Sequence, residues 1–213
     1  MAGACRCRVS GVGAGVLPGA PGADRPLGQL ACHARLAACE PLAVHPGALA
    51  TLGDLLFGFT LSWWAGTLYW GWLRAEPMLH LPVEAIPLPI AATALLFGYF
   101  RNGSLFFLGS LLGTCLTDFY CMSIGLMPWW ERMMNAENNA SALATVLPAA
   151  LAQMHTPVGG VLAAGVALVL LAITLWAMRS KELPMWTFAG AVFSTLLVDG
   201  LFWLSANLYL VGS

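Results

Sequence analysis

The chain has 213 residues, of which 59% are hydrophobic and 9% charged, with a formal net charge of -1. Soluble globular domains carry about 25% charged residues, so this composition and a mean hydropathy of +0.78 indicate an integral membrane protein. The net charge says nothing about partners, but the lack of a basic stripe argues against nucleic acid. The lipid bilayer is therefore the first partner that the composition implies.

Residues 1–48 differ from the rest of the chain because they are rich in Gly, Pro, Ala and Arg and show no periodicity. The apolar run at 9–17 is short and interrupted by glycines, which is unlike a signal peptide. We expect a flexible, disordered leader here, or an over-extended start. Its cysteines and histidines lack the tight paired spacing of a zinc site, so we predict no metal.

The remainder, residues 49–213, is dominated by long apolar runs. A helix of about 20 apolar residues crosses the hydrocarbon core of a bilayer. The predicted fold is an all-α membrane bundle of five transmembrane helices. These spans are 52–73, 83–100, 104–127, 158–178 and 185–211.

Residues 128–154 separate the third and fourth spans and are too polar at their start to cross a membrane. We expect an interfacial segment in which Trp129 and Trp130 lie at headgroup level, with Arg132 beside them. A weakly amphipathic helix would follow on the membrane surface.

His80 precedes the predicted second span and lies near Glu76 and Glu84. An interfacial histidine beside carboxylates can bind a metal or the magnesium of a pigment. A solvated loop histidine is nevertheless the more common case, and that is our prediction.

Positive charges in the short loops predict the orientation. Arg101, Arg179 and Lys181 lie on the same side as the leader, whereas Arg74 and Arg132 lie on the other side. We therefore expect the leader on the cytoplasmic side and the C-terminus on the opposite side.

Two stretches of the chain resemble each other. Residues 107–118 and 188–199 share the pattern Phe-x-Gly-x-x-x-small-Thr-x-Leu-x-Asp, with five identities in twelve positions. A Pro-Val pair and an arginine precede each copy, so each unit is predicted to be a helical hairpin. One full span separates the copies, which makes them parallel and implies a pseudo-two-fold axis along the membrane normal, with the first span as an extra helix. Chance similarity between Leu-, Ala- and Gly-rich helices is the alternative.

Each copy ends in an acid inside an apolar run, at Asp118 and Asp199. A charged side chain there costs roughly 2.5–3.5 kcal/mol even on lenient insertion scales. Thr114 and Thr195 lie one turn before the acids, so their hydroxyls are expected to bond the carboxyl groups. No Arg, Lys or His is predicted at that depth. The pair is either interhelical glue or a proton, cation or ligand site.

The same copies carry small residues at a spacing of four. Gly109 and Gly113 form a close-packing face on the third span, and Gly190 and Ser194 are predicted to do the same on the fifth.

Several longer motifs carry a resemblance to a known family. They are Tyr69-Trp-Gly-Trp72-Leu-Arg74-x-Glu76-Pro77, His80-Leu-Pro82-x-Glu84-Ala, Leu108-Gly-Ser-Leu-x-Gly113-Thr114-x-x-Thr117-Asp118 and Phe193-Ser-Thr195-x-Leu-Val-Asp199-Gly-Leu-Phe-Trp203. From about Asp54 onward the chain resembles an uncharacterised family of integral membrane proteins of cyanobacteria, a domain of unknown function. The resemblance implies a thylakoid or plasma membrane and transfers no active site.

This resemblance, more than any single residue, implies an accessory or assembly protein of the photosynthetic membrane that associates with a larger membrane protein complex. The alternatives are a small-solute or ion carrier that uses the paired aspartates, and a membrane enzyme acting on a lipid or pigment. The chain holds no nucleophile elbow, P-loop, HExxH or dinucleotide motif, so catalysis is not indicated. No cofactor is specified, and pigment binding is left open.

Overall fold

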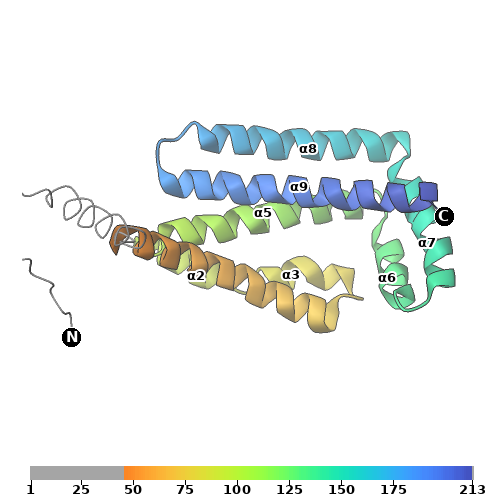
Figure 1. The fold of residues 1–213 in the computed structure, drawn as a ribbon, viewed down its shortest axis with the longest axis horizontal. Coiled ribbons are helices and arrows are strands. Elements are labelled where there is room, and N and C mark those ends of the chain that lie inside the picture. The colour runs from red at the N-terminus through yellow and green to blue at the C-terminus, as the bar shows by residue number, and fades with distance from the viewer. Residues whose placement is uncertain (1–45, 213) are drawn as a thin grey trace, which may run out of the picture. The chain divides into compact units, whose positions relative to one another are not determined.

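The computed structural model describes residues 46–212, and these residues form helices and turns without any strand (Figure 1). The predicted leader falls outside the described residues except for its last three, which already belong to the first helix. In chain order the elements are α2 (Pro46–Leu68), η1 (Tyr69–Leu73), η2 (Pro77–Leu79), α3 (His80–Glu84), α4 (Leu88–Leu96), α5 (Arg101–Ser123), α6 (Met127–Ala136), α7 (Ala140–Met154), α8 (Pro157–Met178) and α9 (Leu183–Gly212).

Five stretches of the described chain are long and apolar enough to cross a membrane, which confirms the predicted all-α fold and its five spans. They are α2 with η1, the run from η2 to α4, α5, α8 and α9. Figure 1 shows α5 between α2 and α9, with α8 against the far side of α9. The two short helices α6 and α7 lie at the end of the bundle where α5 and α9 finish.

A glycine contact and a carboxylate join α2 to α5. Gly58 and Gly103 face each other so closely that a Cβ on either would overlap backbone atoms of the other helix. Asp54, one turn before Gly58, accepts hydrogen bonds from the backbone N–H groups of Asn102 (3.1 Å) and Gly103 (2.7 Å) and from the Asn102 amide (2.8 Å). A carboxylate from α2 therefore caps the N-terminus of α5, whose first N–H groups have no partner within their own helix.

We expect Asp54→Ala to lower the free energy of unfolding by about 2–3 kcal/mol, because it removes a helix cap that acts through charged hydrogen bonds. Urea or SDS unfolding in detergent micelles measures the change. Thr51→Ala is the matched control, since the Thr51 hydroxyl bonds only to the carbonyl of Gly47 in its own helix. Equal stability of the two variants would contradict the capping role.

The second span differs from its prediction. It begins at Pro77 rather than at residue 83, and it is broken between α3 and α4. Pro87 and Pro89 lack the N–H groups that would continue α3 into α4, and the chain turns between Glu84 and Leu88. The predicted end at residue 100 was also too late, because α4 stops at Leu96.

The third and fifth spans are parallel, as predicted. Near the start of both helices Thr187 donates to the carbonyl of Asn102 (3.1 Å), and farther along the Gly113 backbone lies against Thr195. A Cβ on Gly109 would come within 2.7 Å of the Phe188 carbonyl oxygen. The glycine face of α5 therefore packs against α9, as expected.

The second copy of the motif is used differently. Gly190 and Ser194 are exposed on α9, and a Cβ on Gly190 would meet no atom within 4 Å. The predicted packing role of these two residues is therefore wrong within the described chain, because the side of α9 that faces α5 carries Phe188, Ala191 and Thr195 instead. The gene-duplication interpretation itself stays a prediction.

Candidate functional site

His80 lies between two carboxylates inside the second span. Its Nδ1 is 3.0 Å from Oδ1 of Asp118, and its Nε2 is 3.2 Å from Oε1 of Glu84. The three side chains are 16%, 13% and 19% exposed, respectively. We call these three residues the histidine–carboxylate cluster.

Local structure explains how the chain assembles this cluster. His80 begins α3, and Glu84 follows one turn later, where residues four apart share a helix face. Asp118 comes from α5, five residues before that helix ends. The fully buried ring of Tyr69, in the π-helical segment η1, lies 4.3 Å from the imidazole centroid to centroid. Single π-helical turns are common beside functional groups.

The hydrogen-bond geometry sets the number of protons in the cluster. A neutral imidazole has one N–H and one lone pair, whereas an ionised carboxylate only accepts. A carboxyl group at each ring nitrogen thus requires either an imidazolium or one protonated carboxyl group. Both arrangements hold one proton more than a neutral ring between two carboxylates, and both leave one net negative charge. The cluster is therefore able to share a proton among three residues.

Asp199 lies on α9 beside this cluster. Its Oδ2 accepts a hydrogen bond of 2.7 Å from the hydroxyl of Thr117, the residue before Asp118. The two aspartates thus lie on neighbouring parallel helices, and a threonine of one helix holds the acid of the other. This hydrogen bond joins α5 to α9, which is the type of polar contact between membrane helices that was considered as one role for the aspartates.

Three details of the predicted site are wrong. A histidine does lie at the depth of Asp118, because the second span begins early enough to include His80. Thr114 is not the partner of Asp118; it lines a small cavity together with Glu84. Thr195 donates to the Ala191 carbonyl (3.4 Å) and packs on Gly113 rather than bonding Asp199.

Sequence reasoning also missed Glu84 and Thr117 as site residues. The spacing of four between His80 and Glu84 was a usable signal, provided that both lie in a helix. For Thr117 the signal was its position directly before Asp118 in a largely apolar span.

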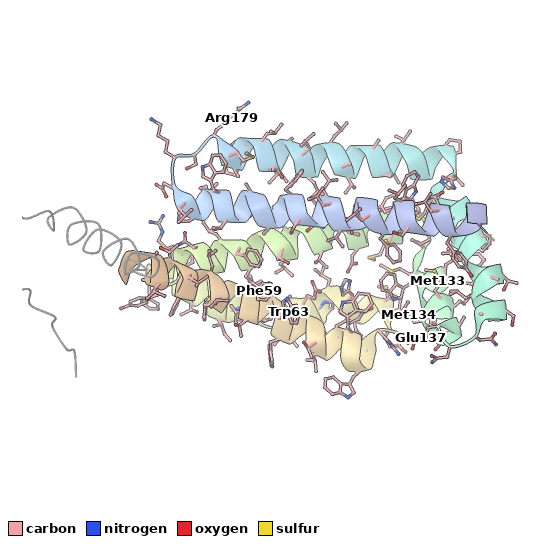
Figure 2. All side chains as sticks on the ribbon, in the orientation of Figure 1. Phe59, Trp63, Met133, Met134, Glu137 and Arg179 are labelled. Atoms are coloured by element: carbon pink, nitrogen blue, oxygen red, sulfur yellow. The ribbon has the colours of Figure 1, made fainter. Side chains whose placement is uncertain are left out.

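A helix covers the cluster at the end of the bundle. Trp130 of α6 lies over the imidazole, with ring centroids 6.4 Å apart, and its indole N–H donates to the carbonyl of Arg74 at 2.9 Å. The Arg74 guanidinium forms an ion pair with Glu137 just after α6, and Figure 2 labels Glu137 at that position. Two contacts therefore hold α6 onto the segment that precedes His80.

The predicted interfacial residues pack on the protein. Trp129 is half-buried against the Tyr120 and Ile124 cluster, and the Arg132 guanidinium lies 4.8 Å from its ring centroid. Trp130 is half-buried over His80. The two tryptophans therefore do not project freely, although α6 as a whole lies at the expected end of the bundle. Among the described residues, no group of three or more His, Cys, Asp or Glu side chains has the arrangement to hold a metal ion.

Fold and site together define an α-helical integral membrane protein with five spans and a cluster of ionisable side chains within them. A family model described as "Protein of unknown function (DUF3120)" matches residues 26–207. The chain belongs to this family, which is consistent with the resemblance noted from its motifs. Comparison with curated proteins and with solved structures finds no match.

Proposed function

We propose that this protein is a proton-coupled carrier of a small solute or ion, and that the histidine–carboxylate cluster with Asp199 is its proton site. The observation that carries the proposal is His80, which has a carboxyl group within hydrogen-bond distance of each ring nitrogen inside a membrane span. Ionisable residues in membrane spans are costly and typically mark proton relays and ion pathways.

The broken second span supports this proposal. Discontinuous membrane helices form the substrate and coupling-ion sites of many secondary transporters. Here the break between α3 and α4 directly follows Glu84, one of the two carboxylates on His80. Movement of α3 would therefore change the contacts of the cluster.

The test uses proteoliposomes with an internal pH dye and a panel of small organic acids, amino acids, sugars and monovalent and divalent cations. We expect at least one solute to move protons with the wild-type protein and not with Asp118→Asn. Glu182→Gln is the matched control, because this exposed glutamate pairs with Arg101 at the other end of α5. Equal proton movement by wild type and Asp118→Asn, or none by the folded wild type with any solute, would refute the proposal.

A second candidate function is the accessory role in a photosynthetic membrane, thylakoid or plasma membrane, that the family resemblance implies. The observation that favours it is the pair Trp63 and Trp64, which are 64% and 55% exposed on α2 within a membrane span. Tryptophan prefers the membrane interface over the hydrocarbon core, so two outward rings at this depth suit contact with a protein or pigment. Co-migration with a pigment–protein complex on a native gel, lost in Trp64→Leu, tests this role. If the wild-type protein migrates without any such complex, this role is contradicted.

The orientation also remains a proposal, with the leader side cytoplasmic. In this orientation the cluster lies nearer the non-cytoplasmic surface, at the end of the bundle that α6 covers.

A further inference from the structure

An aromatic groove runs between α2 and α5 on the outside of the bundle. Its volume is about 380 Å³, within the range of small-molecule sites. The ring of Phe59 lies 5.2 Å from that of Trp63 and 6.2 Å from that of Phe106 on α5. Trp70 extends the aromatic wall, and Figure 2 shows Phe59 and Trp63 one turn apart on α2. Because both helices are membrane spans, the open side of the groove faces lipid.

The floor of this groove is polar. Ser62 and Ser110 line the groove, and they also line a smaller cavity of about 70 Å³ that reaches Thr114 and Glu84. The Ser62 hydroxyl is buried and has no hydrogen-bond partner. A buried polar group without a partner costs about 1–3 kcal/mol, so a ligand or water oxygen is expected beside it.

We propose that the groove and the cavity form one binding site for a lipid-soluble molecule that has a single planar ring with an oxygen at its edge, as in the head group of a quinone or quinol. The ring lies among the aromatic side chains, which favour offset or edge-to-face contacts with a second ring. The ring oxygen hydrogen-bonds to Ser62, and an apolar tail leaves through the open side into the bilayer.

The polar floor distinguishes this occupant from an ordinary lipid chain. An acyl chain fills the aromatic groove equally well but offers nothing to the Ser62 hydroxyl or to the cavity behind it. The cavity ends on Glu84, whose carboxylate is bonded to His80, so the bound oxygen lies one short polar path from the histidine–carboxylate cluster. Binding at this site does not require that the protein carry protons, and so the inference goes beyond the proposed carrier function.

Gly66 offers a variant that blocks the groove. It lines the groove, and a Cβ built there meets no atom within 4 Å, so Gly66→Leu extends a side chain into open space without a clash. Gly160 on α8 has the same free surroundings but lies outside the groove, which makes Gly160→Leu the matched control. A size-exclusion profile verifies that both variants are folded.

The experiment labels the full chain in lipid nanodiscs with a photoreactive short-chain benzoquinone and maps the labelled peptides by mass spectrometry. We expect saturable labelling of α2 and α5 in the wild type and in Gly160→Leu, and a roughly tenfold weaker affinity in Gly66→Leu. Ser62→Ala should weaken affinity about fivefold, the equivalent of one neutral hydrogen bond. The Ser62→Ala substitution should not change the affinity for a ring analogue that lacks the oxygen.

Three results would overturn the proposal. The first is labelling spread over all five spans in proportion to their exposure to lipid. The second is unchanged labelling in the folded Gly66→Leu variant, and the third is equal competition by a plain fatty acid. None of them depends on proton movement by the proteoliposomes, so failure of this site is distinguishable from failure of the carrier proposal.

Discussion

Gly103→Val is expected to destabilise the folded bundle strongly. Gly103 lies directly against the backbone of α2. An added Cβ would overlap the carbonyl oxygen of Asp54 and lie 2.7 Å from the nitrogen of Gly58. Backbone atoms cannot rotate away as a flexible side chain can, so α2 and α5 would have to separate. Overpacking in a well-packed core costs about 1–3 kcal/mol and occasionally more. We expect about 3 kcal/mol or more here, because separation also breaks the three hydrogen bonds of Asp54.

The measurement is the fraction of protein that runs as a monodisperse peak in mild detergent, followed by unfolding of whatever remains folded. Gly53→Ala, on the partner helix α2, is the matched control, since a Cβ at Gly53 meets nothing within 4 Å. Glycine is about 0.5–1 kcal/mol worse than alanine inside a helix, so this variant should be as stable as the wild type or slightly more stable. A wild-type elution profile for Gly103→Val would show that α2 and α5 do not pack through these glycines.

The sequence predicted the class of fold because hydrophobic length is a strong and local signal. Each of the five spans is a run of apolar residues long enough for the bilayer, and none needs tertiary information to be recognised. The parallel direction of α5 and α9 followed from counting spans. The glycine face of α5 followed from helical periodicity, and both were confirmed.

The candidate site was only half predictable, and the cause is a helix boundary. His80 was placed in a loop because the second span was predicted to begin at residue 83. The helix instead begins at Pro77, where proline is favoured in the first turn. An error of six residues at one helix end removed the histidine from the membrane and left Asp118 without a basic partner. Helix ends are less certain than helix existence.

The sequence repeat gave a wrong prediction for Gly190 and Ser194 for a different reason. Equal motifs in two helices predict equal roles only if both hairpins have equal neighbours. Here α8 is a continuous helix of 22 residues, whereas its counterpart α4 has 9. In addition, the extra helix α2 packs against α5 and lies apart from α9 (Figure 1). Gly190 consequently faces outward while Gly109 faces α9. Asp199 bonds to Thr117, a residue that the second copy of the motif replaces with Val198.

His80→Leu is the second variant with a large expected effect. It leaves the carboxyl groups of Asp118 and Glu84 without the ring that lies between them. Removing one partner of a buried ion pair costs about 3–5 kcal/mol, because the remaining charge stays poorly solvated. We expect about 3 kcal/mol, the lower end of this range, since Glu84 also faces the small cavity and can be hydrated there. SDS unfolding followed by far-UV circular dichroism measures the loss.

The control is His155→Leu, which changes the same residue type at an exposed position, where the ring lies 6.0 Å from that of Trp203 without a carboxylate partner. It should alter stability by less than about 0.5 kcal/mol. The double variant His80→Leu/Asp118→Leu then separates pairing from packing. If the two residues stabilise each other, the double variant should be more stable than the sum of the single losses predicts, by about 1–3 kcal/mol. Strict additivity, or a His80→Leu variant as stable as His155→Leu, would mean that the histidine and the aspartate do not share a proton in the folded protein.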